Sequence, residues 1–258
     1  MSVIDNKETH RLESLTWEYY NQYISKDITY KNCEIIYTDN IENDYNILTG
    51  RRRKFLRNIS GTTYYNNHSS KVFIQYQDDY YNENYYKMII LTTIHELIHI
   101  NDYVNFTNHG LNSSIHSNIR EQIVLWSEFH AYYLQFLHMP YISAFYNNIK
   151  PELFTPNYTD VYKFDDIIST LQMSPKNGID IMIFMACISV YVTNLNQQKA
   201  EYILKNTLNK LNVQDHASSF CQLYNLLHET LAEESPEMQT LLDVYSFVSD
   251  CRNILKEA

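Results

Sequence analysis

Residues 84–103 limit what this chain can fold into more than any other segment, because apolar side chains surround the segment on nearly every side. This pattern predicts a helix buried at the centre of the protein. The same segment contains His95, Glu96 and His99. Burying two imidazoles and a carboxylate without partners is costly. The fold must therefore supply partners for them, either a metal ion or the ordinary hydrogen bonds of a protein core.

The spacing of these three residues favours the metal ion. Residues four apart lie on one face of a helix, about 6 Å apart along its axis, so His95 and His99 can bind the same ion. A glutamate directly after the first histidine is typical of zinc metallopeptidases. Zinc lowers the pKa of water to about 7, and the glutamate accepts the proton of that water. We predict that His95 and His99 bind Zn²⁺ and that Glu96 is the catalytic base.

Glu128 is the predicted third ligand. It lies in a second predicted helix, residues 117–138, with Leu125 one turn before it and Ala131 one turn after it. A carboxylate within such an apolar stripe needs a partner, and a neighbouring metal ion would supply one. The small side chain of Ala131 would also let two helices approach closely.

Other side chains remain open as the third ligand. Asp102 is nearest in sequence, but on a continuous helix it lies about 10 Å along the axis from His95, whereas zinc ligands lie about 2 Å from the ion. His109 and His116 fall on the polar connection between the two helices and could reach the site. Glu121 is predicted to be solvated, and His130 to be a histidine at the edge of the core.

The arrangement His95-Glu96-x-x-His99 followed by Glu128-x-x-Ala131 resembles the zincins whose third ligand is glutamate. The run from Glu128 to Pro140 is similar to the ImmA/IrrE-type metallopeptidases, and the resemblance covers residues 30–140. It implies an α+β fold with a small sheet before the central helix, and regulated cleavage of a partner such as a transcriptional repressor. The chain departs from the pattern at residue 98, an isoleucine where the family often has glycine.

The pattern in the rest of the first half predicts a mixture of helix and strand. Residues 7–26 are predicted to form a helix and residues 33–38 a strand, and residues 62–65 and 71–77 are predicted to form a hairpin. The second helix is expected to stop at Pro140. We therefore predict an α+β fold in which a small mixed sheet packs on the central helix.

The second half is predicted to be mostly helical. Its expected helices cover residues 161–173, 179–195, 198–211, 220–231 and 238–255. We expect two domains, with a zincin-like metallopeptidase domain at residues 1–150 and a helical region at residues 151–258.

Charge and cysteine content exclude several classes of protein. A net charge of −10 disfavours binding to nucleic acid. The 4 cysteines are scattered without a CxxC pair, which argues against a disulfide scaffold and against a cysteine-ligated zinc. Residues 1–11 lack the apolar core of a signal peptide, and no apolar stretch is long enough to span a bilayer. We expect a cytoplasmic protein that does not associate with membranes.

Residues 51–54 read Arg-Arg-Arg-Lys and form a basic cluster in this acidic chain. Such a cluster could contact phosphate or an acidic partner. A solvated helix face is the simpler interpretation.

Together these features predict a zinc-dependent metallopeptidase that hydrolyses a peptide bond in an intracellular protein or peptide. The alternative is a non-catalytic zinc-binding module that regulates or binds another protein. Deformylase-like hydrolysis of a non-peptide amide would require a cysteine ligand in a separate motif, and the chain has no such motif.

Overall fold

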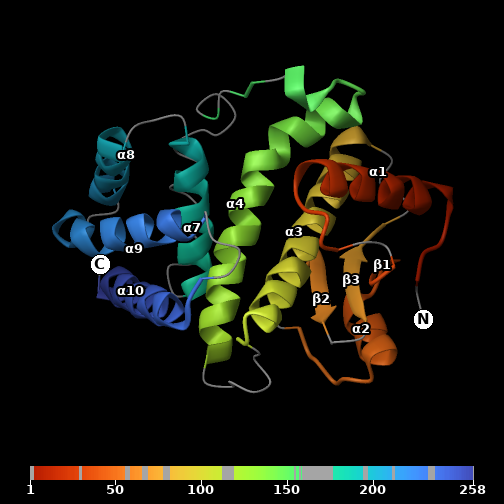
Figure 1. Ribbon diagram of the computed structural model, residues 1–258, viewed down its shortest axis with the longest axis horizontal. Helices are drawn as coiled ribbons and strands as arrows, with labels where there is room; N and C mark the ends of the chain where they lie inside the picture. The colour runs from red at the N-terminus through yellow and green to blue at the C-terminus, as the bar shows by residue number, and fades with distance from the viewer. Residues whose placement is uncertain are drawn as a thin grey trace. The chain divides into compact units, whose positions relative to one another are not determined.

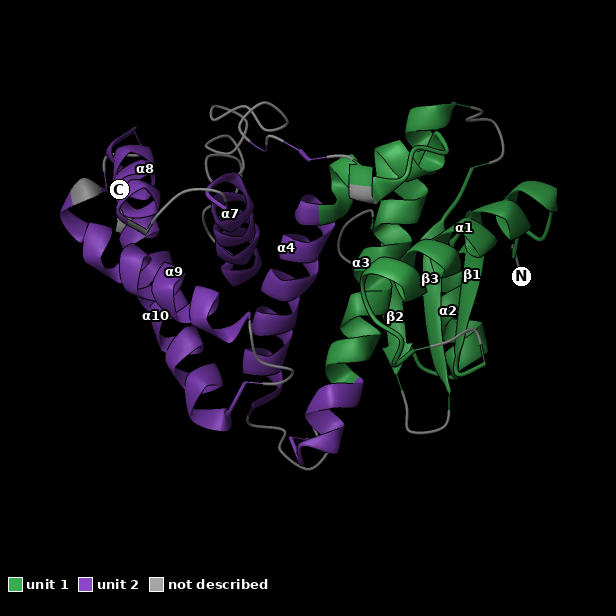
Figure 2. Ribbon diagram, turned by 45° about the horizontal axis from the view of Figure 1, so that its top comes forward, with its two compact units in different colours: residues 1–103, 138–154 green, residues 104–137, 155–258 purple. Residues whose placement is uncertain are grey.

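The computed structural model describes residues 3–28, 31–55, 59–65, 69–77, 82–111, 119–153, 155–156, 158, 177–193, 197–210, 213–231 and 236–257. The chain divides into two compact units (Figure 2). Unit 1 comprises residues 1–103 and 138–154, and unit 2 comprises residues 104–137 and 155–258. These units interleave along the chain. The division into domains at residue 150 stays a prediction.

A three-stranded mixed sheet forms the centre of unit 1, in the order β1-β3-β2 (Figure 1). Strand β1 (Cys33–Thr38) runs parallel to β3 (Ser70–Gln75), and β2 (Gly61–Tyr65) runs antiparallel to β3. The predicted α+β class, with a small mixed sheet before a mostly helical half, is confirmed. The sequence pattern also predicted the strand at residues 33–38 and the hairpin of β2 and β3.

Helix α3 (Glu83–Asn108) packs on one face of the sheet, where Tyr65 of β2 stacks on Tyr103 of α3 with ring centroids 6.1 Å apart. On the opposite face, Phe73 of β3 joins a cluster with Tyr45 of helix α2 (Ile41–Thr49). The sequence pattern did not predict α2. Its signals are local, since the side chain of Asn40 caps its N-terminus and Gly50 ends it at a φ of 66°.

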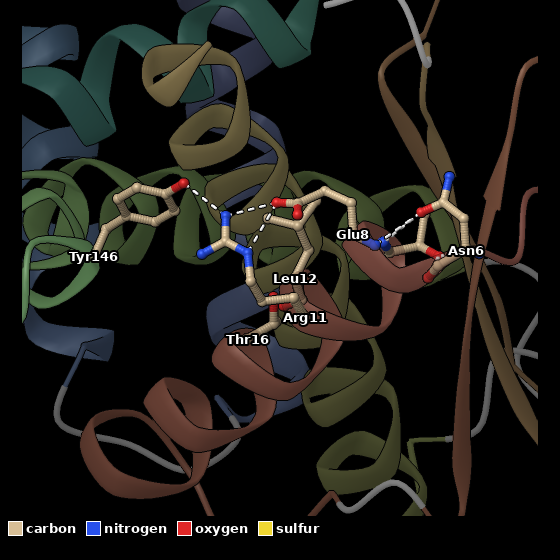
Figure 3. Close-up of polar contacts among 7 residues, drawn as sticks. Asn6, Glu8, Arg11, Leu12, Thr16 and Tyr146 are labelled. Carbon is tan, nitrogen blue, oxygen red and sulfur yellow. Dashed lines mark hydrogen bonds and ion pairs between the residues drawn. The ribbon is translucent and has the colours of Figure 1, made fainter. Parts of the chain in front are cut away.

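Helix α1 (Lys7–Tyr23) starts at a capping box, in which the Asn6 side chain accepts hydrogen bonds from the backbone N–H groups of Glu8 and Thr9 (Figure 3). One turn later, Arg11 donates to the Glu8 carboxylate and to the Tyr146 hydroxyl, at 2.6 and 2.7 Å (Figure 3). Residue 146 ends α4, so this contact joins two helices that are far apart in the sequence.

Helix α4 (Arg120–Tyr146) continues past Pro140, so the predicted stop at this proline is wrong. A proline inside a helix removes one hydrogen bond and costs about 3 kcal/mol or more. Packing beyond the proline offsets this cost. Ile142 is fully buried, and Phe145 makes an edge contact with Tyr19 of α1 at 5.2 Å.

The described part of unit 2 is helical, as predicted. After α4 come α7 (Gly178–Tyr191), α8 (Gln197–Lys210), α9 (Ala217–Thr230) and α10 (Met238–Glu257). The Trp126 indole of α4 donates a 2.9 Å hydrogen bond to Thr230 of α9. The predicted helix at residues 161–173 lies outside the described residues. None of the described helices is long and apolar enough to cross a lipid bilayer.

His138 of α4 gives unit 1 a stability that depends on pH. Burial lowers the pKa of His138 to about 4, and its Nδ1 shares a 2.9 Å hydrogen bond with the Tyr19 hydroxyl. Between about pH 4 and pH 6.5 the unfolded chain binds a proton at this histidine and the folded chain does not, so stability falls as the pH falls through this range.

His138→Gln should reduce this pH dependence, because glutamine can keep a hydrogen bond to Tyr19 and does not titrate. When the pH is lowered from 7 to 4, the free energy of unfolding should fall by up to about 3 kcal/mol more in the unsubstituted protein than in the variant. Urea unfolding at a series of pH values, followed by circular dichroism, measures the difference. Identical slopes for the two proteins would contradict the prediction.

Candidate metal centre

The two histidines of the His-Glu-x-x-His pattern meet on α3, as their spacing predicts. His95 and His99 are each 7% exposed, and their Nε2 atoms lie 3.1 Å apart. Two nitrogens that each lie about 2.0–2.1 Å from one tetrahedral zinc ion are separated by roughly 3.3 Å. The imidazoles are therefore spaced as two ligands of one zinc ion would be.

Glu128 of α4 joins the two histidines. One ligand atom from each of His95, His99 and Glu128 lies within 4.8 Å of the other two. Among the described residues, these side chains form the only group of three histidine, cysteine or acidic residues close enough to hold a metal ion. Two imidazoles and one carboxylate are a known ligand set of catalytic zinc sites, in which water or substrate takes the fourth position.

The electrostatics of Glu128 also suit a cation site. Burial raises the pKa of this carboxyl group to about 7. A nearby divalent cation favours the charged carboxylate and would lower this pKa again. Without a cation, holding Glu128 ionised above pH 7 costs stability.

No protein family, curated protein or solved structure matches this chain. The resemblance to the ImmA/IrrE-type metallopeptidases therefore stays a prediction. The proximity of His95, His99 and Glu128 supports a metal site independently of that resemblance.

The other candidate ligands lie elsewhere or outside the described residues. Asp102 is buried on α3. His109 is exposed, and its Nδ1 lies 2.8 Å from the carbonyl oxygen of Asn105. Among the described residues, neither side chain belongs to a group of three that could hold a metal ion. His116 lies outside the described residues. Glu121 is exposed, as predicted, and accepts a hydrogen bond from Tyr245. The ring of His130 lies over Trp126 at 4.9 Å.

Glu96, the predicted catalytic base, lies on α3 next to the first strand residue of β2. A Cβ atom placed on Gly61 would lie 2.8 Å from Cγ and 2.9 Å from Oε1 of Glu96. These distances are below any normal contact, so a side chain at residue 61 would force the Glu96 side chain to shift. The sequence pattern did not predict this role for Gly61. Its signal was a glycine directly before the strand predicted at residues 62–65, in a chain with 4 glycines.

Gly61→Ala is expected to displace the Glu96 carboxylate and to lower the peptide hydrolysis predicted from the sequence by about ten- to a hundredfold, because catalysis is sensitive to shifts of about 1 Å. Zinc content should not change, because the three predicted ligands are untouched. Steady-state cleavage and metal analysis measure both quantities.

Gly178→Ala is the matched control for this substitution. Its new methyl group would lie 3.1 Å from Leu125 in unit 2, so it also crowds a packed core but does not touch Glu96. If hydrolysis falls equally in both variants, the loss in Gly61→Ala is due to general destabilisation and not to displacement of Glu96.

Proposed function

We propose that this protein is a zinc-dependent metallopeptidase that hydrolyses a peptide bond in a cytoplasmic protein or peptide. The observation that carries the proposal is the cluster of His95, His99 and Glu128, with Glu96 on the same helix as the two histidines. Zinc held by these three residues would act as a Lewis acid that makes water more acidic and polarises the substrate carbonyl.

Glu96 is the residue that moves protons in this proposal. As the water attacks the carbonyl carbon, a carboxylate oxygen of Glu96 takes a proton from it. The same oxygen then delivers this proton to the nitrogen of the leaving amine, so Glu96 ends each cycle as it began. The side chain is only 8% exposed, which keeps bulk water away from the transferred proton.

Strand β2 offers a binding edge for an extended peptide beside Glu96. It is the outer strand of the order β1-β3-β2, and within the described residues it pairs only with β3. An extended peptide can add to such an edge through backbone hydrogen bonds, which hold it without requiring a particular sequence. Because Gly61 lies against Glu96, a peptide on this edge would run past the catalytic base.

The test is cleavage of a randomised peptide mixture by the zinc-loaded protein, with chelator-treated protein and Glu96→Gln as comparisons and mass spectrometry as the readout. New termini that depend on both zinc and Glu96 would support the proposal. A protein that binds zinc stoichiometrically but releases no new termini would instead be the non-catalytic zinc-binding module.

A further inference from the structure

The basic cluster, defined here as residues 51–54, is not the solvated helix face expected from the sequence. Its residues follow Gly50 outside any helix, and all four side chains are exposed. None of them forms an ion pair with a carboxylate among the described residues, although the chain carries a net charge of −10. Within the described part of the chain, no carboxylate neutralises these four positive charges.

Contacts with aromatic rings hold two of these arginines in place. The Arg51 guanidinium lies 5.0 Å from the ring centre of Tyr64, and that of Arg53 lies 4.7 Å from Phe55. The Asn46 side chain also fixes the backbone of Arg53, accepting from its N–H at 2.6 Å and donating to its carbonyl at 3.0 Å. Because these groups are already ordered, binding a carboxylate costs little conformational entropy.

This cluster borders the strand that the proposed function assigns to the substrate. Tyr64 lies on β2, on the face turned towards α2, where its ring is 6.3 Å from Tyr45. Gly61, which contacts Glu96, is three residues earlier on the same strand, or roughly 10 Å away. A peptide paired with β2 would place one side chain opposite Tyr64, with its Cβ about 5 Å from that of Tyr64. That side chain would lie next to the Arg51 guanidinium.

Arg51 and Arg52 also line an open hollow that runs along α2 from Asn40 to Gly50, with a volume of about 640 Å³. This hollow is large enough to accept a carboxylate side chain. Its one acidic lining residue, Glu42, already accepts a hydrogen bond from the backbone N–H of Phe55.

We propose that Arg51 and Arg53 form a specificity subsite that selects peptide substrates carrying aspartate or glutamate roughly three residues from the scissile bond. This inference rests on the proposed function and names its substrate class. Guanidinium groups pair with carboxylates through two parallel hydrogen bonds, so arginine suits this recognition better than lysine. An acidic peptide is favoured over nucleic acid because a protein of net charge −10 repels a polyanion, whereas a short peptide presents only one or two charges.

The experiment maps cleavage sites in a randomised peptide mixture with the full-length, zinc-loaded protein. The unvaried protein should favour aspartate or glutamate at one position by roughly two- to fivefold, the range for solvent-exposed ion pairs. Arg51→Gln with Arg53→Gln should abolish this preference, and Arg51→Glu with Arg53→Glu should convert it into a preference for lysine or arginine. Added salt should weaken the preference.

Arg252→Glu with Lys256→Glu is the matched control, because it makes the same charge change at exposed positions of α10. This control should keep the acidic preference. Cleavage without an acidic preference, or with a preference that survives the Arg51 and Arg53 changes, would overturn the subsite and leave the proposed function standing.

Fluorescence anisotropy with a labelled glutamate-containing peptide separates the remaining outcomes. One outcome is that no peptide is cleaved, that the labelled peptide nevertheless binds, and that Arg51→Glu with Arg53→Glu abolishes this binding. The proposed function then fails and the acid-binding surface stands. Failure of the peptide to bind the unvaried protein would overturn the surface. Displacement of the peptide by a single-stranded oligonucleotide at a lower concentration than unlabelled peptide would assign the cluster to nucleic acid instead.

Discussion

Glu96→Gln is expected to lower peptide hydrolysis by about 10²- to 10⁴-fold while zinc stays bound. Glutamine has nearly the shape of glutamate but cannot accept the proton of the attacking water. The three predicted ligands His95, His99 and Glu128 are unchanged, so the metal site should remain intact. The loss should appear in kcat more than in KM, because the proposed binding of substrate to β2 would not involve proton transfer.

The measurement pairs steady-state cleavage with metal analysis of the same preparation. Glu83→Gln is the control, because Glu83 is a solvent-accessible glutamate in the first turn of the same helix and pairs there with Lys87. Its activity should match that of the unvaried protein. Equal hydrolysis by Glu96→Gln and the unvaried protein would refute the proposed mechanism, whatever the metal content.

His99→Ala and Glu128→Ala are each expected to abolish stoichiometric zinc binding, because each removes one of three ligands. Zinc at a hundred times its dissociation constant adds about 2.7 kcal/mol to stability. Zinc should therefore raise the unfolding midpoint of the unvaried protein by roughly 5 to 10 °C and leave both variants unchanged. Metal analysis and thermal unfolding with and without zinc measure these effects.

Glu128→Ala has a second expected result in the absence of metal. Burial raises the pKa of Glu128 to about 7, so the folded state favours the protonated carboxyl and loses stability as the pH rises towards 7. Removing the carboxyl group removes this loss. Above pH 7 and without metal, Glu128→Ala should therefore lower the free energy of unfolding by less than a large-to-small substitution in the core usually does. The stability of the variant should also depend less on pH than that of the unsubstituted protein.

Glu121→Ala is the control for Glu128→Ala, because this exposed glutamate lies on the same helix. It should keep both zinc and the thermal shift. Retention of zinc by Glu128→Ala would transfer the role of third ligand to His109, His116 or Asp102.

Local sequence patterns predicted the helices and strands that are determined by the residues within them. The apolar residues around His95 predicted a buried helix, and α3 is that helix, although it extends five residues beyond the predicted end at residue 103. The β-branched run at residues 33–38 predicted β1 with its observed bounds. Helix α2 was missed because it has only 9 residues, too few for a clear apolar period.

Contacts between distant segments decided what local patterns could not. Proline chemistry predicted that α4 would end at Pro140, but burial of Ile142 and contact between Phe145 and Tyr19 stabilise the helix beyond it. The parallel pairing of β1 with β3 similarly depends on a crossover, which the strand patterns do not specify.

The candidate metal centre likewise has one part with a local cause and one part that depends on tertiary packing. The sequence by itself determined that His95 and His99 share one helix face with Glu96 beside them, because helical periodicity is a property of the local backbone. Only the tertiary structure decided that Glu128 comes within ligand distance of both histidines and that Gly61 lies against Glu96. Those approaches depend on how whole helices and strands pack, and packing is a property of the whole chain.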